Sequence, residues 1–184
     1  MSNTASNMIP LGFSAPDFKL IDTISGKLLT LDQLKGEKAT MIFFICNHCP
    51  FVIHINEELI RLAGEYQTKG VGFIAISSND IENYPQDRPE LMKKLGLHLG
   101  YPFPYLYDET QEVARIYDAA CTPDIYLFDK DLKLNYRGQL DDSRPGNNRP
   151  VTGEDVREAI ELILNGKDPL EFQKPSMGCN IKWK

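Results

Sequence analysis

The stretch Ala39-Thr-Met-Ile-Phe-Phe-Ile-Cys46-Asn-His-Cys49-Pro50 joins an uncharged run to two closely spaced cysteines and a proline. A run like residues 39–45 is typical of a strand that is buried on both faces of a sheet. Proline is favoured in the first turn of a helix, and a helical pattern follows Pro50 as far as Lys69-Gly70. The apolar stripe of this pattern contains Val52, Ile55, Leu59, Leu62 and Tyr66. The stretch therefore predicts a buried strand that runs into a helix, with Cys-x-x-Cys at the junction.

The flanking segments extend this unit in both directions. Residues 71–76 form a second apolar run, so the strand–helix–strand order predicts two parallel strands. Upstream, residues 18–31 resemble a hairpin that turns near Ser25-Gly26. Downstream, residues 77–107 are expected to be an insertion with one short helix over about 89–97.

The remaining chain predicts two further helices and a second hairpin. Residues 110–119 are expected to be helical, with Val113, Ile116 and Tyr117 facing inward. Strands over 125–128 and 132–137 should pair around Asp129-Lys-Asp131. After the polar loop 141–150, Thr152 is the expected N-cap of a helix that ends at Gly166. The fold class is α/β, with a mixed central sheet flanked by helices.

Length and composition set the domain organisation. A chain of 184 residues suits one domain, 1–184, with a core over about 10–166. The tail 167–184 contains Ile181 and Trp183, which are too apolar for a purely solvated segment, so we expect it to dock on the domain. The pairs Glu57-Glu58 and Asp141-Asp142 are expected to form solvated faces.

Charge and hydropathy exclude several function classes. The net charge is −6 and no basic block occurs, so a nucleic-acid partner is not expected. No apolar run approaches the ~20 residues that a membrane span requires. Residues 1–10 have neither the positive nor the apolar region of a signal peptide, so the expected location is the cytoplasm. In that reducing compartment a close cysteine pair is catalytic or metal-binding more often than structural.

The chemistry of the cysteine pair follows from its position. A thiolate at a helix N-terminus is stabilised by free N–H groups and the helix dipole, so we expect a lowered pKa for Cys46. Cys49 lies nearly one turn further on, where it can attack a mixed disulfide formed by Cys46. His48 can be cationic near neutral pH and is expected to stabilise the Cys46 thiolate. His54 lies off the apolar stripe and is expected at the surface.

Metal binding is the competing use of these residues. A zinc or copper site would recruit Cys46 and Cys49, with His48, His54 or Cys179 as further ligands. The spacing around the second half of such a set does not fit a zinc finger, although copper(I) suits soft thiolates. The preferred interpretation has no metal and no cofactor.

The pattern resembles the thioredoxin superfamily, over about residues 10–166. It is similar in particular to the thioredoxin-like (TlpA/ResA-like) branch of the alkyl hydroperoxide reductase/thiol-specific antioxidant group, through Leu11-Gly-Phe-Ser-Ala-Pro-Asp-Phe18 and residues 108–129. The resemblance implies that Thr122-Pro123 is the family's cis-proline loop. This loop faces the redox pair, and Pro123 would leave an open backbone edge for a partner segment. Cys121 would then lie at the rim of the site.

Several positions depart from the family patterns. Ile45 replaces the tryptophan that usually precedes the first cysteine, and Thr40 replaces the buried carboxylate of thioredoxin. The peroxiredoxin signature requires proline and threonine where this chain has Ala39 and Phe43. The position of the peroxiredoxin arginine aligns with Pro123 in this chain. The pattern of an activated-peroxide site is therefore absent.

The resemblance implies a thiol–disulfide oxidoreductase with Cys46 as nucleophile and Cys49 as resolving residue. His48 and Pro123 complete the expected catalytic set, and Cys121 and Cys179 are possible accessory redox residues. The implied partners are disulfides or thiols of proteins or small molecules, together with an electron-donor reductase. The alternatives are a thiol peroxidase with antioxidant activity, and a redox- or copper(I)-responsive binding module.

Overall fold

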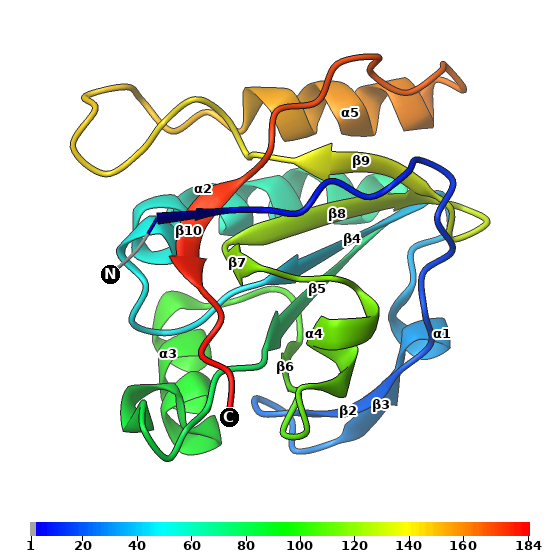
Figure 1. Cartoon of the computed structure of the whole chain (residues 1–184). Coiled ribbons are helices and arrows are strands. Elements are labelled where there is room, and N and C mark those ends of the chain that lie inside the picture. The colour runs from blue at the N-terminus through cyan, green and yellow to red at the C-terminus, as the bar shows by residue number, and fades with distance from the viewer. Residues whose placement is uncertain (1–2) are drawn as a thin grey trace.

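The computed structural model describes residues 3–184, so Met1 and Ser2 of the predicted domain lie outside the described residues. Two sheets organise the chain (Figure 1). The larger sheet has the strand order β3-β2-β6-β5-β4-β8-β9, and the smaller has the order β1-β10-β7. The strands are β1 (Asn3–Ala5), β2 (Lys19–Asp22), β3 (Leu28–Thr30), β4 (Ala39–Phe44), β5 (Val71–Ser77), β6 (Tyr105–Tyr107), β7 (Cys121–Thr122), β8 (Asp124–Asp129), β9 (Leu134–Gly138) and β10 (Met177–Asn180).

Helices cover both faces of the larger sheet. They are α1 (Leu31–Leu34), α2 (Pro50–Tyr66), α3 (Pro89–Leu99), α4 (Glu112–Ile116) and α5 (Glu154–Leu164), with 3₁₀ helices η1 (Gln67–Lys69) and η2 (Pro85–Asp87). One core lies between the sheet and α2, α3 and α5, and the other between the sheet and α1 and α4. Alternate residues of β4 serve the two cores: Met41 and Phe43 face the first, and Ile42 and Phe44 face the second. This division explains why β4 is wholly buried. None of the described helices is long and apolar enough to cross a membrane.

The predicted α/β class with a mixed sheet is confirmed. β4 runs parallel to β5 and antiparallel to β8, and β8 forms the expected hairpin with β9. The N-terminal hairpin pairs β2 with β3, and Gly26 takes a positive φ of 73° in its turn. The insertion contains α3 as expected, but it also contains β6, which lies between β5 and β2.

Two details of the helices differ from expectation. α4 spans only five residues, bounded by Gln111 and Asp118 with positive φ, and Ile116 is 48% exposed rather than inward. The N-cap of α5 is Gly153, with φ +64°, rather than Thr152. The reason is the Asp141 carboxylate, which accepts hydrogen bonds from the N–H groups of both Thr152 and Gly153 at 2.7 Å.

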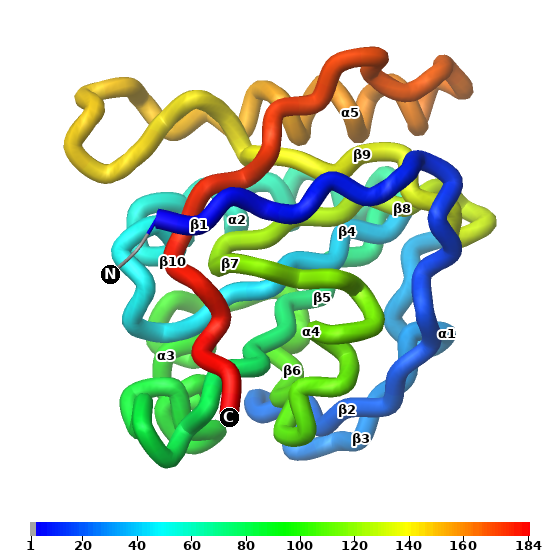
Figure 2. Tube along the Cα trace, viewed as in Figure 1, coloured from blue at the N-terminus to red at the C-terminus, as the bar shows by residue number. Residues whose placement is uncertain are grey.

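The smaller sheet joins the two ends of the described chain. β10 pairs antiparallel with β1 on one side and with β7 on the other. Figure 2 shows these terminal segments side by side across the front of the molecule. Ile181, directly after β10, is only 1% exposed and packs in the core shared with α1 and α4. The tail is therefore an integral strand of the fold and covers the end of β7.

Candidate active site

The cysteine pair lies where β4 passes into α2. Cys46 and Cys49 are 1% and 0% exposed, and both are free thiols. The helix begins at Pro50, so Cys49 is its N-cap residue, and its carbonyl accepts the N–H of Ile53 at 2.9 Å. The free N–H groups of the first turn therefore lie next to Cys49, whereas Cys46 is still in the preceding loop.

The loop before β8 closes against both sulfurs. The Thr122–Pro123 peptide bond is cis, as the resemblance implied. The hydroxyl of Thr122 lies 3.6 Å from the Cys46 Sγ, and its carbonyl oxygen accepts the Cys49 thiol at 3.1 Å. One residue thus contacts the two members of the pair with two different groups.

A buried carboxylate lies beside the pair on the other side. Asp87 of η2 is 0% exposed, and a carboxylate oxygen of Asp87 lies 2.7 Å from His48 Nδ1. It also accepts the backbone N–H of Asn47 at 2.8 Å and an amide N–H of Asn79 at 2.9 Å. His48 Nδ1 lies 3.8 Å from the Cys46 Sγ, and its ring stacks on Tyr84 at a centroid distance of 5.7 Å. This arrangement fixes the imidazole between the carboxylate and the sulfur.

Asp87 is a site residue that the sequence did not indicate. It comes from the insertion, in Tyr84-Pro-Gln-Asp87-Arg-Pro89, and no spacing links it to the cysteines. The two flanking prolines, which favour a fixed backbone, are the one signal that could have drawn attention to it. Thr40, at the position of the thioredoxin carboxylate, instead accepts the N–H of Gly36 at 3.0 Å.

The expected pKa assignment within the pair is wrong. The hydrogen bond to Cys49, burial and the negative charge of Asp87 raise the pKa of Cys46. The pKa of Cys49 is lowered, chiefly by the hydrogen bond from Cys46 and further by those from Cys179 and the Val52 N–H. The largest cause for both residues is their mutual hydrogen bond, and the N–H of Val52 in the first turn of α2 adds to the lowering at Cys49. The two thiols are therefore coupled through one hydrogen bond and titrate as a pair.

The other two cysteines occupy different environments. Cys179 of β10 lies with its Sγ 2.9 Å from the Cys49 Sγ. Burial and the hydrogen bond to Cys49 raise the pKa of Cys179 to about 12. Cys121 is fully buried, and its thiol donates to the carbonyl of Pro123 at 3.5 Å. The structure thus adds Cys179, but not Cys121, to the sulfur contacts of the pair.

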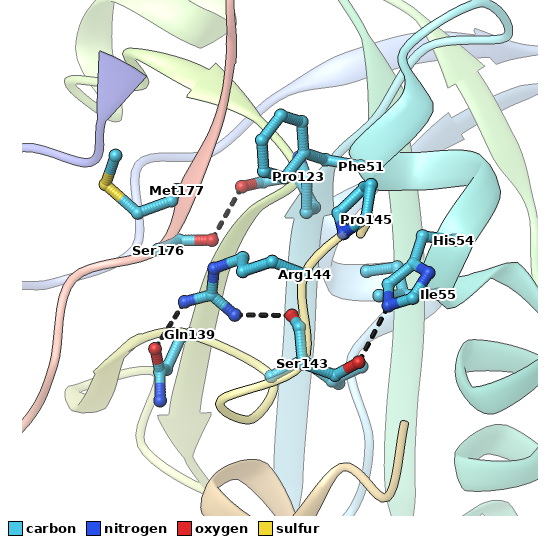
Figure 3. A pocket seen from close by; sticks show the side chains of 11 residues that line it. Phe51, His54, Ile55, Pro123, Gln139, Ser143, Arg144, Pro145, Ser176 and Met177 are labelled. Atoms are coloured by element: carbon cyan, nitrogen blue, oxygen red, sulfur yellow. Dashed lines mark hydrogen bonds between the residues drawn. The ribbon is translucent and has the colours of Figure 1, made fainter. Parts of the chain in front are cut away.

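The expected open edge at the cis-proline loop is occupied. β10 pairs with β7, with Cys179 opposite Thr122 and Asn180 opposite Cys121. The Ser176 hydroxyl donates to the Pro123 carbonyl at 2.8 Å (Figure 3). The hollow beside this contact measures about 10 Å³, close to the space of one water molecule. The backbone edge of β7 is therefore paired within this chain and is not open to a partner segment.

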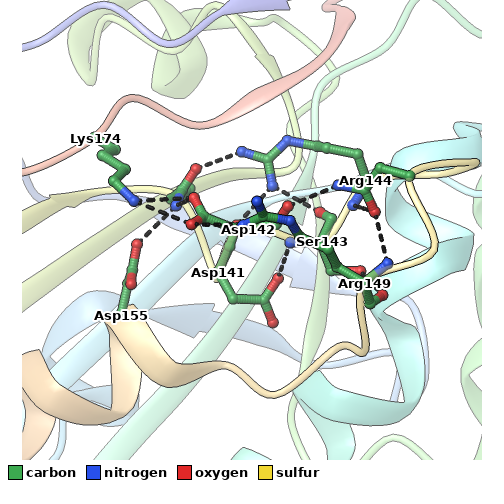
Figure 4. Close-up of polar contacts among 9 residues, drawn as sticks. Asp141, Asp142, Ser143, Arg144, Arg149, Asp155 and Lys174 are labelled. Carbon is green, nitrogen blue, oxygen red and sulfur yellow. Dashed lines mark hydrogen bonds and ion pairs between the residues drawn. The ribbon is translucent and has the colours of Figure 1, made fainter.

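Three surface assignments also need correction. His54 is half-buried, and its Nε2 lies 2.7 Å from the Ser143 hydroxyl, so it anchors the loop that follows β9 rather than facing solvent (Figure 3). Asp141 is 2% exposed and accepts N–H groups within that loop, whereas Asp142 pairs with Lys174 and Arg149 at the surface (Figure 4). Glu58 on α2 is likewise buried.

Three atoms of the site have the spacing of metal ligands. The Cys46 Sγ, a nitrogen of His48 and a carboxylate oxygen of Asp87 all lie within 4.8 Å of one another. His48 Nδ1 is already paired with Asp87, and neither His54 nor Cys179 belongs to this group. The set thus differs from the ligands that the sequence suggested.

The chain is similar to a known protein family and to proteins of known structure. The family model described as AhpC/TSA matches residues 11–137. The thiol–disulfide oxidoreductase ResA of Halalkalibacterium halodurans is 28% identical over 153 residues, which cover 83% of this chain and 76% of that protein. The crystal structure of an uncharacterized conserved protein from Geobacillus kaustophilus is 61% identical, with a TM-score of 0.98, and the match covers 100% of this chain and 97% of that one.

More distant structures show the fold. The thioredoxin domain of a thiol–disulfide oxidoreductase from Bacteroides vulgatus superposes with a TM-score of 0.66 at 20% identity, covering 86% of this chain and 100% of that one. The predicted thioredoxin fold is therefore confirmed.

Proposed function

The chain belongs to the AhpC/TSA family, and on that premise we propose that it is a thiol–disulfide oxidoreductase whose redox pair is Cys46 and Cys49. The observation that carries the proposal is the position of this pair, between the end of β4, the N-terminus of α2 and the cis Thr122–Pro123 bond. The hydroxyl and carbonyl of Thr122 contact one sulfur each. The similarity to ResA supports the same class of reaction.

In the proposed reaction Cys46 attacks the substrate disulfide. The shared proton moves from Cys46 to Cys49 along the hydrogen bond between them, which leaves the thiolate on Cys46. Attack forms a Cys46–substrate disulfide and releases the other substrate sulfur as a thiolate, which takes a proton from solvent. Cys49 then attacks the Cys46 Sγ, the Cys46–substrate bond breaks, and the proton of Cys49 passes to the departing sulfur, which leaves as the second substrate thiol. The substrate gains two electrons and the pair is oxidised to a disulfide.

Each neighbouring group has a role in this scheme. The Thr122 hydroxyl stabilises the Cys46 thiolate, because it can donate to it from 3.6 Å and thereby lowers the pKa of Cys46. Asp87 acts in the opposite sense on Cys46 and orients His48. The substrates are disulfides of proteins or small molecules, a reductase supplies the electrons, and the cytoplasm is the proposed location.

The test compares a disulfide with a peroxide as oxidant. In Cys121→Ser/Cys179→Ser protein only the proposed pair can respond. We expect rapid oxidation by a small-molecule disulfide and slow oxidation by hydrogen peroxide. Among the described residues, His48 and Thr122 offer the Cys46 Sγ hydrogen bonds from outside the pair, and neither supplies the arginine of peroxiredoxins. Cys49→Ser should accumulate the mixed disulfide, and Cys46→Ser should not react. A peroxide rate orders of magnitude above that of a free thiolate would instead support the thiol peroxidase.

A further inference from the structure

The C-terminal strand brings a third thiol to the pair by close backbone contact. β10 lies against β7, with Cys179 in register with Thr122. Gly178 makes this approach possible, since a Cβ at this position would lie only 1.9 Å from the Thr122 carbonyl oxygen. A residue with a side chain at position 178 would displace β10 from β7.

Several contacts hold β10 in that position. On the N-terminal side, the N–H of Ser176 donates to the Ser6 hydroxyl at 2.9 Å, and the Ser6 N–H donates to the Ser176 carbonyl at the same distance. On the C-terminal side, the N–H of Lys182 donates to Asn79 at 2.9 Å. The carbonyl of Lys182 accepts the N–H of Asp80 at 2.7 Å. Cys179 is therefore fixed between two anchored ends and is only 3% exposed.

The contact between Cys49 and Cys179 is close enough for exchange. Their sulfurs lie 2.9 Å apart, whereas a disulfide bond measures about 2.05 Å, so closure requires a movement of roughly 0.9 Å. Cys49 also shares a hydrogen bond with Cys46. The Cys49 sulfur is thus in contact with the sulfurs of both Cys46 and Cys179.

We propose that Cys179 is a third redox residue, which exchanges with the Cys46–Cys49 disulfide to give a Cys49–Cys179 disulfide and a free Cys46 thiol. The proposal rests on the thiol–disulfide chemistry proposed above. The Cys179 sulfur attacks the Cys49 Sγ, the Cys46–Cys49 bond breaks, and the proton of Cys179 passes to Cys46. One disulfide replaces another, so no outside oxidant or reductant is needed. Cys46 becomes free again while the oxidised state is held by Cys49 and Cys179.

The experiment maps disulfides after oxidation with trans-4,5-dihydroxy-1,2-dithiane. Wild-type protein is quenched in acid, its free thiols are alkylated, and linked peptides are identified by mass spectrometry. We expect a Cys49–Cys179 link with alkylated Cys46, in addition to the Cys46–Cys49 link. Cys46→Ser/Cys121→Ser protein should lose two hydrogen atoms in mass and form the Cys49–Cys179 link. The matched control Cys46→Ser/Cys179→Ser should form no intramolecular link.

The outcomes separate the two proposals. If wild-type protein forms only the Cys46–Cys49 link and the Cys46→Ser/Cys121→Ser variant stays reduced, the role of Cys179 is refuted and the oxidoreductase proposal stands. If wild-type protein forms no Cys46–Cys49 link and does not turn over disulfides, the proposed function fails. Serine is close in size to cysteine, so Cys179→Ser protein should have a native circular dichroism spectrum, and peptide mapping should show the loss of the Cys49–Cys179 link alone.

Discussion

Replacing Asp87 by asparagine should make Cys46 more acidic. A carboxylate oxygen of Asp87 lies within 4.8 Å of the Cys46 Sγ, and the residue is fully buried. At an effective dielectric constant of about 20, two like charges at that distance repel by about 3.5 kcal/mol. This energy corresponds to roughly 2.5 pKa units at about 1.4 kcal/mol per unit. Neighbouring polar groups screen part of this repulsion, so we expect the pKa of Cys46 to fall by about 1 to 2.5 units.

The assay isolates Cys46 from its coupled partner. Thiolate absorbance is recorded against pH for Cys49→Ser and for Cys49→Ser/Asp87→Asn, both with Cys121 and Cys179 replaced by serine. The reaction rate with a small-molecule disulfide at neutral pH should rise as the thiolate fraction rises. Glu82→Gln in the same insertion is the control, because Glu82 is exposed and makes no contact with Cys46. An unchanged or raised pKa in the Asp87→Asn protein would refute the electrostatic role of Asp87.

Three further predictions follow from other contacts. Thr122→Val should raise the pKa of Cys46, because the hydroxyl that lowers it is lost; an unchanged titration would contradict this role. Gly178→Ala should displace β10 and speed alkylation of the Cys179 thiol. Gly64→Ala is the control, because a Cβ at that position meets nothing within 4 Å. Equal alkylation rates in the two variants would contradict the close contact of Gly178 with Thr122. Arg137→Met leaves the buried Asp124 without its ion-pair partner, so urea unfolding should show a free energy of unfolding lower by about 3–5 kcal/mol. Lys35→Met removes an exposed ion pair and should lower it by under about 1 kcal/mol. Equal losses in the two variants would refute the argument from burial.

The elements that the sequence predicted well depend on local patterns. The strand predicted over 39–45 is observed as β4, which ends at Phe44. The helix predicted from Pro50 to Lys69 is observed as α2 followed by η1. β6 was missed because Tyr105–Tyr107 is only three residues long and is a strand through its pairing with β5 and β2. The cap of α5 was misplaced by one residue because Asp141, far from the helix in sequence, supplies the acceptor.

The candidate site was predictable where its residues are adjacent in sequence. Cys46, His48 and Cys49 follow from one motif, and Pro123 follows from the family resemblance. Asp87 and the contact of Cys179 arise from tertiary structure, since the first comes from an insertion and the second from a tail that pairs with β7. The pKa order within the pair depends on the mutual hydrogen bond and on the nearby Asp87, which the local sequence does not reveal.

The pairing of β1 with β10 has a consequence for the order of folding. It joins residue 3 to residue 179, so nearly the whole chain lies in the loop that this contact closes. Contacts of such sequence separation carry the largest loop-closure entropy and slow folding. We therefore expect the smaller sheet to form after β4 and α2 have packed. Until then Cys49 lacks its contact with Cys179, and the disappearance of rapid alkylation at Cys49 during refolding would time the final step of assembly.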